Sequence, residues 1–299
     1  MMYHQPVLLH ESIEGLNIRP DGTYIDATYG GGGHSKEILK HLITGKLVAF
    51  DMDGDAEKNK IDDEHFLFVR HNFRYMKNFI KYYNISQVDG ILADLGVSSH
   101  QFDQAERGFS FRSDAALDMR MNNKSHKNAT AIINTYSEEK LSDMFFQYGE
   151  LANARKLAAT IIQSRRKQQL KTINQFVESI KTCIPIYSDN KYLAQVFQSI
   201  RIEVNNELGN LKELLKQSVQ LLADKGRLVI ITYHSLEDRL VKNFMRTGNF
   251  EGKPEKDFYG NVSSPFRPVN KNVIVPAENE LKSNNRARSA KLRIAERIV

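Results

Sequence analysis

The sequence predicts an α/β protein with a mainly parallel sheet and an inserted helical block. Apolar, strand-like segments alternate with helical patterns over about the first hundred residues. From 113 to 205 the periodicity is helical and no strand pattern stands out. The clearest strand pattern, 227–232, follows that block. Apolar strands separated by helices pair in parallel and need helices on both faces. The pattern therefore predicts a sheet domain of 1–112 and 206–299, interrupted by a helical domain of 113–205.

Each element follows from a local pattern of apolar residues and turn signals. Before the helical block, strands are expected over 23–28, 47–50, 66–69 and 88–92, and helices over 35–42 and 75–82. Inside the block, helices are expected after Ser137, around 157–162 and over 173–180. After the block, a helix is expected over 208–222, closed by 224–226, and a long loop over 248–285 with one short strand at 273–275.

Composition narrows the class of protein. The 299 residues are 41% hydrophobic and 26% charged, which is ordinary for a globular chain and excludes disorder, collagen and a disulfide scaffold. Cys183 is the only cysteine, so no intrachain disulfide and no CxxC pair can form, which suits a reducing cytoplasm. No secretory signal begins the chain, and no apolar run approaches the roughly 18 residues of a membrane span. The net charge of +6 favours a polyanionic partner.

A glycine-rich loop is the strongest site signal. Gly30–Gly33 lie between a strand and a helix, where backbone amides can meet a ligand. Asp51 ends the next strand, about 20 residues on, where an acid can bind ribose hydroxyls. A dinucleotide fingerprint would need glycine at Ser35, and no P-loop lysine is present. Asp26 favours S-adenosylmethionine, because its carboxylate can order the loop and hold the cofactor's ammonium group. The alternative is a tight turn without a ligand, although glycines cost about 1 kcal/mol each in chain entropy.

Two further groups of polar residues follow strands. Asp94 and Gln101 come after the fourth strand, where ligands of open parallel sheets sit, so both can face an adenine or a target base. The alternative for Asp94 is a cap on the next turn. The segment 233–239 brings His234, two acids and an arginine to the end of the fifth strand. The alternative for His234 is a purely structural role.

Two stretches of the chain are strongly basic. Between Leu151 and Val177 there is no acidic residue, and the basic residues include Arg165, Arg166 and Lys167. The C-terminal stretch carries Arg286, Arg288, Lys291, Arg293 and Arg297. Such runs suit phosphate contacts, so Arg165–Lys167, Arg286 and Arg288 are expected to bind RNA. The alternative for each run is a solvated face.

Several motifs in the same order resemble the RsmH (MraW) family, bacterial enzymes that methylate N4 of a decoding-site cytidine in 16S ribosomal RNA. They are 29–35, 94–99, 106–111, 117–121 and 234–239, and the resemblance extends from His4 to Ile298. It implies a class I, Rossmann-like methyltransferase fold with an inserted helical domain for RNA recognition. The partner it implies is 16S ribosomal RNA or the small ribosomal subunit. The cofactor contacts it implies are Gly32, Gly33, His34, Asp51, Phe73, Asp94 and Gln101.

The cysteine content of the chain is consistent with methylation of an amine. Methylation of a pyrimidine ring carbon needs a cysteine nucleophile, and Cys183 lies in the helical block, so direct transfer to an exocyclic amine is expected. The target base must leave its stack to react. Candidates for holding the amine are Asp94, Ser98, Ser99, His234 and Ser235, and no metal ligand set is expected. A nicotinamide oxidoreductase and an RNA-binding assembly factor with an inactive cofactor pocket are the alternatives. The sequence leaves the oligomeric state undetermined.

Overall fold

The computed structural model describes residues 6–187, 189–255, 258 and 264–299. The chain forms two compact units. The sheet unit consists of Met1–Gly96 and Leu208–Val299, and the helical unit of Val97–Glu207. The helical unit begins earlier than the 113 that the periodicity suggests, because Phe109 and its neighbour Phe111 pack into its core. Residues 1–5, where no secretory signal is expected, lie outside the described residues, as does His4 at the start of the resemblance.

The sheet unit is built on a seven-stranded sheet with the order β3-β2-β1-β4-β5-β7-β6. The five strands from β1 to β5 are parallel, and β7 is antiparallel to both of its neighbours. The prediction of a mainly parallel sheet is therefore confirmed. The strands are β1 (Thr23–Asp26), β2 (Lys46–Phe50), β3 (Phe66–Val69), β4 (Val88–Asp94), β5 (Leu222–Thr232), β6 (Phe266–Pro268) and β7 (Lys291–Arg297).

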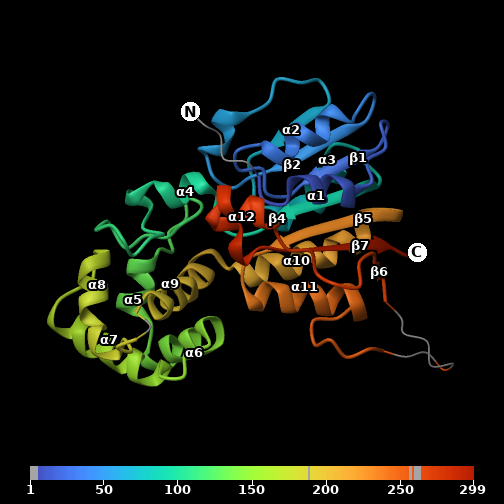
Figure 1. Ribbon diagram of the computed structural model, residues 1–299. Helices are drawn as coiled ribbons and strands as arrows, with labels where there is room; N and C mark the ends of the chain where they lie inside the picture. The colour runs from blue at the N-terminus through green and yellow to red at the C-terminus, as the bar shows by residue number, and fades with distance from the viewer. Residues whose placement is uncertain (1–5, 188, 256–257, 259–263) are drawn as a thin grey trace. The chain divides into compact units, whose positions relative to one another are not determined.

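Alternate residues of the strands point into two separate apolar cores, one on each face of the sheet. Val48 and Phe50 of β2 lie in one core, and Leu47 and Ala49 lie in the other. Helices α3, α10 and α11 cover the first face, and α1 and α2 cover the second (Figure 1). The helices of this unit are α1 (Leu9–Leu16), α2 (Gly33–Lys40), α3 (Met76–Tyr82), α10 (Glu207–Leu221), α11 (Ser235–Thr247) and α12 (Glu278–Ser283), with 3₁₀-helices η1 (Ala56–Asn59), η2 (Phe73–Tyr75) and η5 (Asn285–Ser289).

The C-terminal part of the sheet differs from the sequence-based expectation. The segment 273–275 forms no strand, and only an isolated bridge joins Ile274 to Leu292. The strands there are β6 and β7 instead, and part of the expected loop, 256–257 and 259–263, lies outside the described residues. β5 starts at Leu222, earlier than expected, because the segment 224–226 continues the strand through a register shift.

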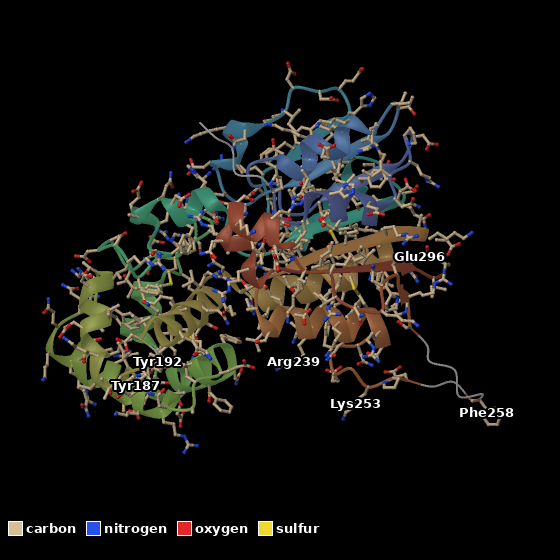
Figure 2. The ribbon with its side chains drawn as sticks, viewed as in Figure 1. Tyr187, Tyr192, Arg239, Lys253, Phe258 and Glu296 are labelled. Atoms are coloured by element: carbon tan, nitrogen blue, oxygen red, sulfur yellow. The ribbon has the colours of Figure 1, made fainter. Side chains whose placement is uncertain are left out.

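β7 is not predicted from the sequence, because many of its residues are basic. Its apolar members alternate with cations that have partners of their own: Arg293 donates to Asp238 over 2.6 Å, and Arg297 donates to the carbonyl of Val219 over 3.0 Å. Glu296 accepts Arg227 of β5 at 3.0 Å (Figure 2). Much of the C-terminal basic run therefore holds the sheet together.

The helical unit has one apolar core, which includes the fully buried rings of Phe145 and Phe176. Ser137 caps α6 as predicted, since its hydroxyl accepts the amide of Lys140. The described residues of this unit form no strand, only an isolated bridge between Ala116 and Thr172 (Figure 1). Its helices are α4 (Ser99–Asp103), α5 (Ala129–Thr135), α6 (Glu138–Gly149), α7 (Ala154–Lys167), α8 (Ile173–Ser179) and α9 (Asp189–Asn205), with η3 (Ala105–Arg107) and η4 (Lys181–Cys183). Among the described residues of either unit, no helix has the length and apolar character to cross a membrane.

Candidate active site

The glycine loop joins β1 to α2 and presents an open backbone. Gly30 and Gly32 have φ values of 52° and 75°, which glycine adopts at little cost. A Cβ on Gly32 would lie 2.7 Å from the Tyr29 hydroxyl, and one on Gly33 would lie 2.2 Å from Pro6. A Cβ on Gly31, by contrast, would meet nothing within 4 Å. The loop is therefore packed on one side and open at Gly31, as a ligand cradle requires.

Asp26 ties this loop to the helix that follows. The Ser35 hydroxyl donates to its carboxylate over 2.6 Å, and the Thr28 amide donates over 3.0 Å. The residue is 1% exposed, and burial raises its pKa to about 6. Asp26 thus orders the loop as expected. Contact of Asp26 with the cofactor's ammonium group stays a prediction.

Asp51 follows β2 directly and contacts the same loop. Its Oδ2 accepts the amide of Gly30 at 2.8 Å, and its Oδ1 accepts the amide of Asp53 at 2.8 Å. Burial raises its pKa to about 6, although the residue is only half-buried. Each carboxylate oxygen can accept a second hydrogen bond. Asp51 is therefore available to ribose hydroxyls, and Phe73 begins η2 after the neighbouring strand.

Asp94 ends β4 in a small polar network. The Tyr233 hydroxyl donates to its Oδ1 over 2.7 Å, and its amide donates to the Thr28 hydroxyl over 2.6 Å. Burial raises the pKa of Asp94 to about 7, and the Tyr233 hydrogen bond opposes that shift. Its side chain is nevertheless 24% exposed. Asp94 is therefore a reachable carboxyl group that changes charge near neutral pH.

His34 faces the same carboxylate as a neutral ring. Its Nε2 lies 3.2 Å from the carbonyl of Val7, which can only accept, so Nε2 carries the proton. Burial lowers the His34 pKa to about 4. Its unprotonated Nδ1 lies 4.0 Å from Oδ2 of Asp94, which is too far for a hydrogen bond. His34 therefore lines this side of Asp94 without adding charge.

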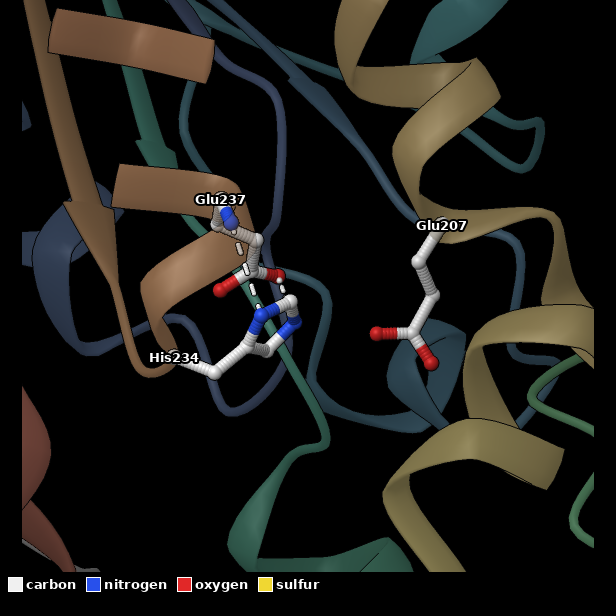
Figure 3. A group of neighbouring side chains, drawn as sticks. All are labelled: Glu207, His234 and Glu237. Atoms are coloured by element: carbon white, nitrogen blue, oxygen red, sulfur yellow. Dashed lines mark hydrogen bonds and ion pairs between the residues drawn. The ribbon is translucent and has the colours of Figure 1, made fainter. Parts of the chain in front are cut away.

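His234 and Glu237 begin α11 beyond the end of β5. Figure 3 shows the His234 ring against the Glu237 carboxylate, with Nε2 3.3 Å from Oε1. His234 Nδ1 accepts the Glu237 amide at 3.4 Å as an N-cap, and Glu237 accepts the Tyr233 amide at 3.0 Å. These contacts support the structural alternative for His234. Ser235 is the first residue of the same helix.

The remaining predicted cofactor and amine contacts belong to the helical unit. Ser98 caps α4, with its hydroxyl accepting the amide of Gln101 and the Gln101 side chain accepting the amide of Ser98, both at 3.2 Å. Ser99 is the first residue of that helix. Ser98 and Gln101 thus have a helix-capping role here, and contacts of Ser98, Ser99 and Gln101 with cofactor or substrate stay predictions.

The predicted RNA-binding cations are not equivalent. Arg165 donates to the carbonyl of Ile133 over 2.8 Å and is half-buried, whereas Arg166 and Lys167 are exposed at the end of α7. Arg286 and Arg288 lie in η5 and are exposed. Arg165 therefore has a structural role, and the other four are exposed to solvent.

The described groups suit S-adenosylmethionine, which carries two positive charges next to a nucleoside. The open backbone at Gly31 and the partly exposed carboxylates of Asp51 and Asp94 match a cationic nucleoside. The order β3-β2-β1-β4-β5-β7-β6 with an antiparallel β7, together with this loop, defines a class I S-adenosylmethionine-dependent methyltransferase.

Comparison with known proteins identifies the family. The sequence model of the MraW methylase family matches residues 1–298, and the chain belongs to this family. Its relatives include proteins named ribosomal RNA small subunit methyltransferase H. The one from Bacteroides thetaiotaomicron is 58% identical over 298 residues, covering 99% of this chain and 98% of that protein. The one from Flavobacterium johnsoniae is 56% identical over 299 residues, covering 100% of this chain and 99% of that protein.

Sequence reasoning missed two members of the site. Tyr233 and Thr28 both contact Asp94, yet neither stood out as a candidate. The available signal was topological: β4 and β5 are neighbours, so a hydroxyl that directly follows β5 comes close to the residue that ends β4. Gly96 lies next to the Tyr233 ring and has φ 101°, a backbone conformation that favours glycine.

Proposed function

We propose that this protein methylates N4 of a decoding-site cytidine in the RNA of the small ribosomal subunit. The observation that carries the proposal is the partly exposed Asp94 carboxylate at the end of β4, with a pKa of about 7. The relatives' names supply the substrate class, since they describe methyltransferases of small-subunit ribosomal RNA. The particular base and atom come from the motifs at 94–99 and 234–239.

The chemistry needs positioning and one proton acceptor. S-adenosylmethionine, when bound, supplies an electrophilic methyl group on its sulfonium. The glycine loop and Asp51 hold the nucleoside end. Asp94 would accept a hydrogen bond from the cytosine amine and take the proton that the nitrogen loses when it is methylated. An acceptor whose pKa lies near the working pH is suited to such a transfer.

No protein nucleophile takes part in this proposal. Cys183 is 4% exposed in the helical unit, and its thiol lies 3.3 Å from the Thr160 hydroxyl. A thiol this deeply buried is out of reach of a substrate base, so it is badly placed to act as a nucleophile. Direct transfer to an amine requires no covalent step, so this environment of Cys183 supports amine methylation over ring-carbon methylation.

RNA recognition is assigned to the predicted cations that are exposed. In the helical unit these are Arg166 and Lys167, and in the sheet unit they are Arg286 and Arg288. Contacts with phosphates position an RNA without reading its bases. The target cytosine must also leave its stack before Asp94 can reach it.

Mass mapping of modified nucleosides tests the proposal. Small-subunit ribosomal RNA from a strain that lacks this protein should lose one methyl group on a decoding-site cytidine. Purified wild-type protein with S-adenosylmethionine should restore that methyl group on subunits from the deletion strain, and the Asp94→Asn variant should not. Methylation at a ring carbon, or an unchanged nucleoside map, would contradict the proposal.

A further inference from the structure

The segment 65–88 of the sheet unit contains no acidic residue between Glu64 and Asp89. It carries four cations, of which Arg70 contacts Glu57 at 3.1 Å. The other three, Arg74, Lys77 and Lys81, belong to η2 and α3. None of these three has a carboxylate partner among the described residues, and both lysines are exposed. This part of the sheet unit is therefore positively charged without internal compensation.

A groove of about 380 Å³ runs between this segment and α10. Its lining includes Arg74, Tyr75 and Lys77 on one side, and Glu213, Lys216 and Gln217 on the other. We call it the α3 groove. Glu213 is the one acid of the lining, and Lys216 lies 3.1 Å from it. The charge left in the α3 groove is therefore positive.

Hydrogen bonds join the two walls of the groove, the η2–α3 segment and α10, and hold them in fixed positions. The Gln217 side chain donates to the carbonyl of Arg74 over 2.6 Å and accepts the amide of Lys77 at 2.9 Å. The Lys77 ammonium donates to the Gln220 side chain over 2.6 Å. Backbone contacts of this kind fix the two walls before any ligand arrives, which lowers the ordering cost of binding.

Exposed aromatic rings accompany the cations. Tyr75 is 40% exposed and Tyr82 is 77% exposed. Tyr75 ends η2 directly before α3, and Tyr82 is the last residue of α3, so the two rings lie at the two ends of this helix. The guanidinium carbon of Arg74 lies 5.2 Å from the centre of the Tyr75 ring. Exposed rings next to cations are the combination that proteins use to bind single-stranded nucleic acid, since bases stack while phosphates pair with the cations.

We propose that the α3 groove binds a single-stranded segment of small-subunit ribosomal RNA. In this proposal Arg74 and Lys77 of the groove lining contact phosphates, and the Tyr75 ring stacks with a base. Lys81 and Tyr82 lie outside that lining, further along α3, and extend the same phosphate and stacking contacts. The inference rests on the proposed function, because that function supplies the polyanionic partner. It adds an RNA contact within the sheet unit, independent of the cations of the helical unit.

Salt dependence of RNA binding tests the groove. The variant Arg74→Gln/Lys77→Gln/Lys81→Gln removes three charges, and Lys225→Gln/Lys253→Gln/Lys271→Gln is the matched control from exposed lysines elsewhere in the sheet unit. Binding to purified 16S ribosomal RNA is measured between about 50 and 200 mM salt. The groove variant should lose about two units of log–log slope, at roughly 0.7 per phosphate contact on a single strand. The control should keep the wild-type slope, and both should bind S-adenosylmethionine normally.

Stacking on Tyr75 and Tyr82 is tested separately, through RNA affinity rather than through the salt slope. Tyr75→Leu and Tyr82→Leu should each weaken RNA binding at least fivefold without changing the slope, because they remove stacking and no charge. Arg74→Lys keeps the charge and should keep the slope, which controls for folding. A groove variant with the full wild-type slope overturns the α3 groove alone. A wild-type protein that binds S-adenosylmethionine but no small-subunit RNA overturns the proposed function instead.

Discussion

The Tyr233 hydroxyl donates a hydrogen bond to Asp94 over 2.7 Å, across 139 residues of sequence. Burial favours the protonated carboxyl and raises its pKa to about 7, whereas the tyrosine donor favours the ionised form. The donor is itself held in the protonated state, since burial raises the Tyr233 pKa. Tyr233 is thus a positioning residue that limits how far burial raises the pKa of Asp94.

Tyr233→Phe should raise the pKa of Asp94 further, because it removes only the donor. A hydrogen bond to a charged group contributes about 1.5–3 kcal/mol, so the midpoint of pH-dependent S-adenosylmethionine binding should move up by about one to two units. Calorimetric titrations with S-adenosylmethionine at several pH values between about 5 and 9, a range that brackets the expected midpoint, would measure the shift. Tyr83→Phe, which changes a half-buried tyrosine of the same unit, should leave the midpoint in place. An unchanged midpoint in Tyr233→Phe would show that this contact does not tune Asp94.

Asp51→Ala should weaken S-adenosylmethionine binding at least tenfold. The change removes an acceptor for ribose hydroxyls and also releases the amide of Gly30, so the loop loses order as well. The lost hydrogen bond to a charged group is worth about 1.5–3 kcal/mol. Asp62→Ala, an exposed acid of the same unit, should bind normally. Equal affinities for the two variants would remove Asp51 from the cofactor site.

Cofactor binding should release protons near neutral pH. Asp51 and Asp94 have pKa values of about 6 and 7, and a cationic ligand favours their ionised forms. Near pH 6.5, the measured enthalpy of cofactor binding should therefore depend on the ionisation enthalpy of the buffer. The affinity for the cofactor should rise as the pH rises through the folded-state pKa values. Asp94→Asn should release fewer protons than the wild type. Identical enthalpies in phosphate and Tris buffers would rule out this linkage.

The stability of the cofactor-free protein should fall as the pH rises, whereas the affinity for the cofactor should rise. A carboxyl whose folded pKa is raised binds its proton more tightly in the folded state than in the unfolded state. The free energy of unfolding should therefore gain a contribution as the pH falls from about 7 towards 4, and lose it as the pH rises through the folded pKa values. Urea unfolding at several pH values would measure this, and Asp94→Asn should flatten the dependence.

Arg166→Gln/Lys167→Gln should weaken RNA binding and reduce its salt slope by about one to two units. Arg165 is kept in this variant, because its bond to the Ile133 carbonyl supports the helical unit. Lys124→Gln/Lys191→Gln, two exposed lysines of the same unit, is the matched control. If the test and control variants bind RNA alike, the end of α7 is a solvated face.

Cys183→Ser should retain near-normal methyl transfer, because the proposed reaction uses no thiol. The serine hydroxyl can keep the contact with Thr160, so folding should be little disturbed. Single-turnover assays at saturating S-adenosylmethionine would compare the two proteins. A covalent RNA adduct at Cys183, or lost activity in a folded serine variant, would point to ring-carbon methylation instead.

The parts of the site that depend on neighbours along the chain could be predicted from the residue pattern alone. Alternating strand and helix patterns predicted the parallel strands from β1 to β5. The glycine loop, Asp51 and Asp94 followed from their places at strand ends. These features are local, because periodicity and glycine conformation act over a few residues.

Contacts between groups that are far apart in the sequence could not be predicted, because they depend on how the chain packs. The buried carboxylate of Asp26 accepts hydrogen bonds from Ser35 and Thr28, and the sequence pattern does not indicate the Ser35 contact. The basic C-terminal run contained β7, whose Arg293 pairs with Asp238 across 55 residues. A charged side chain looks the same in sequence whether it meets solvent, RNA or an internal partner, because its partner is chosen by packing and burial rather than by its neighbours in the chain.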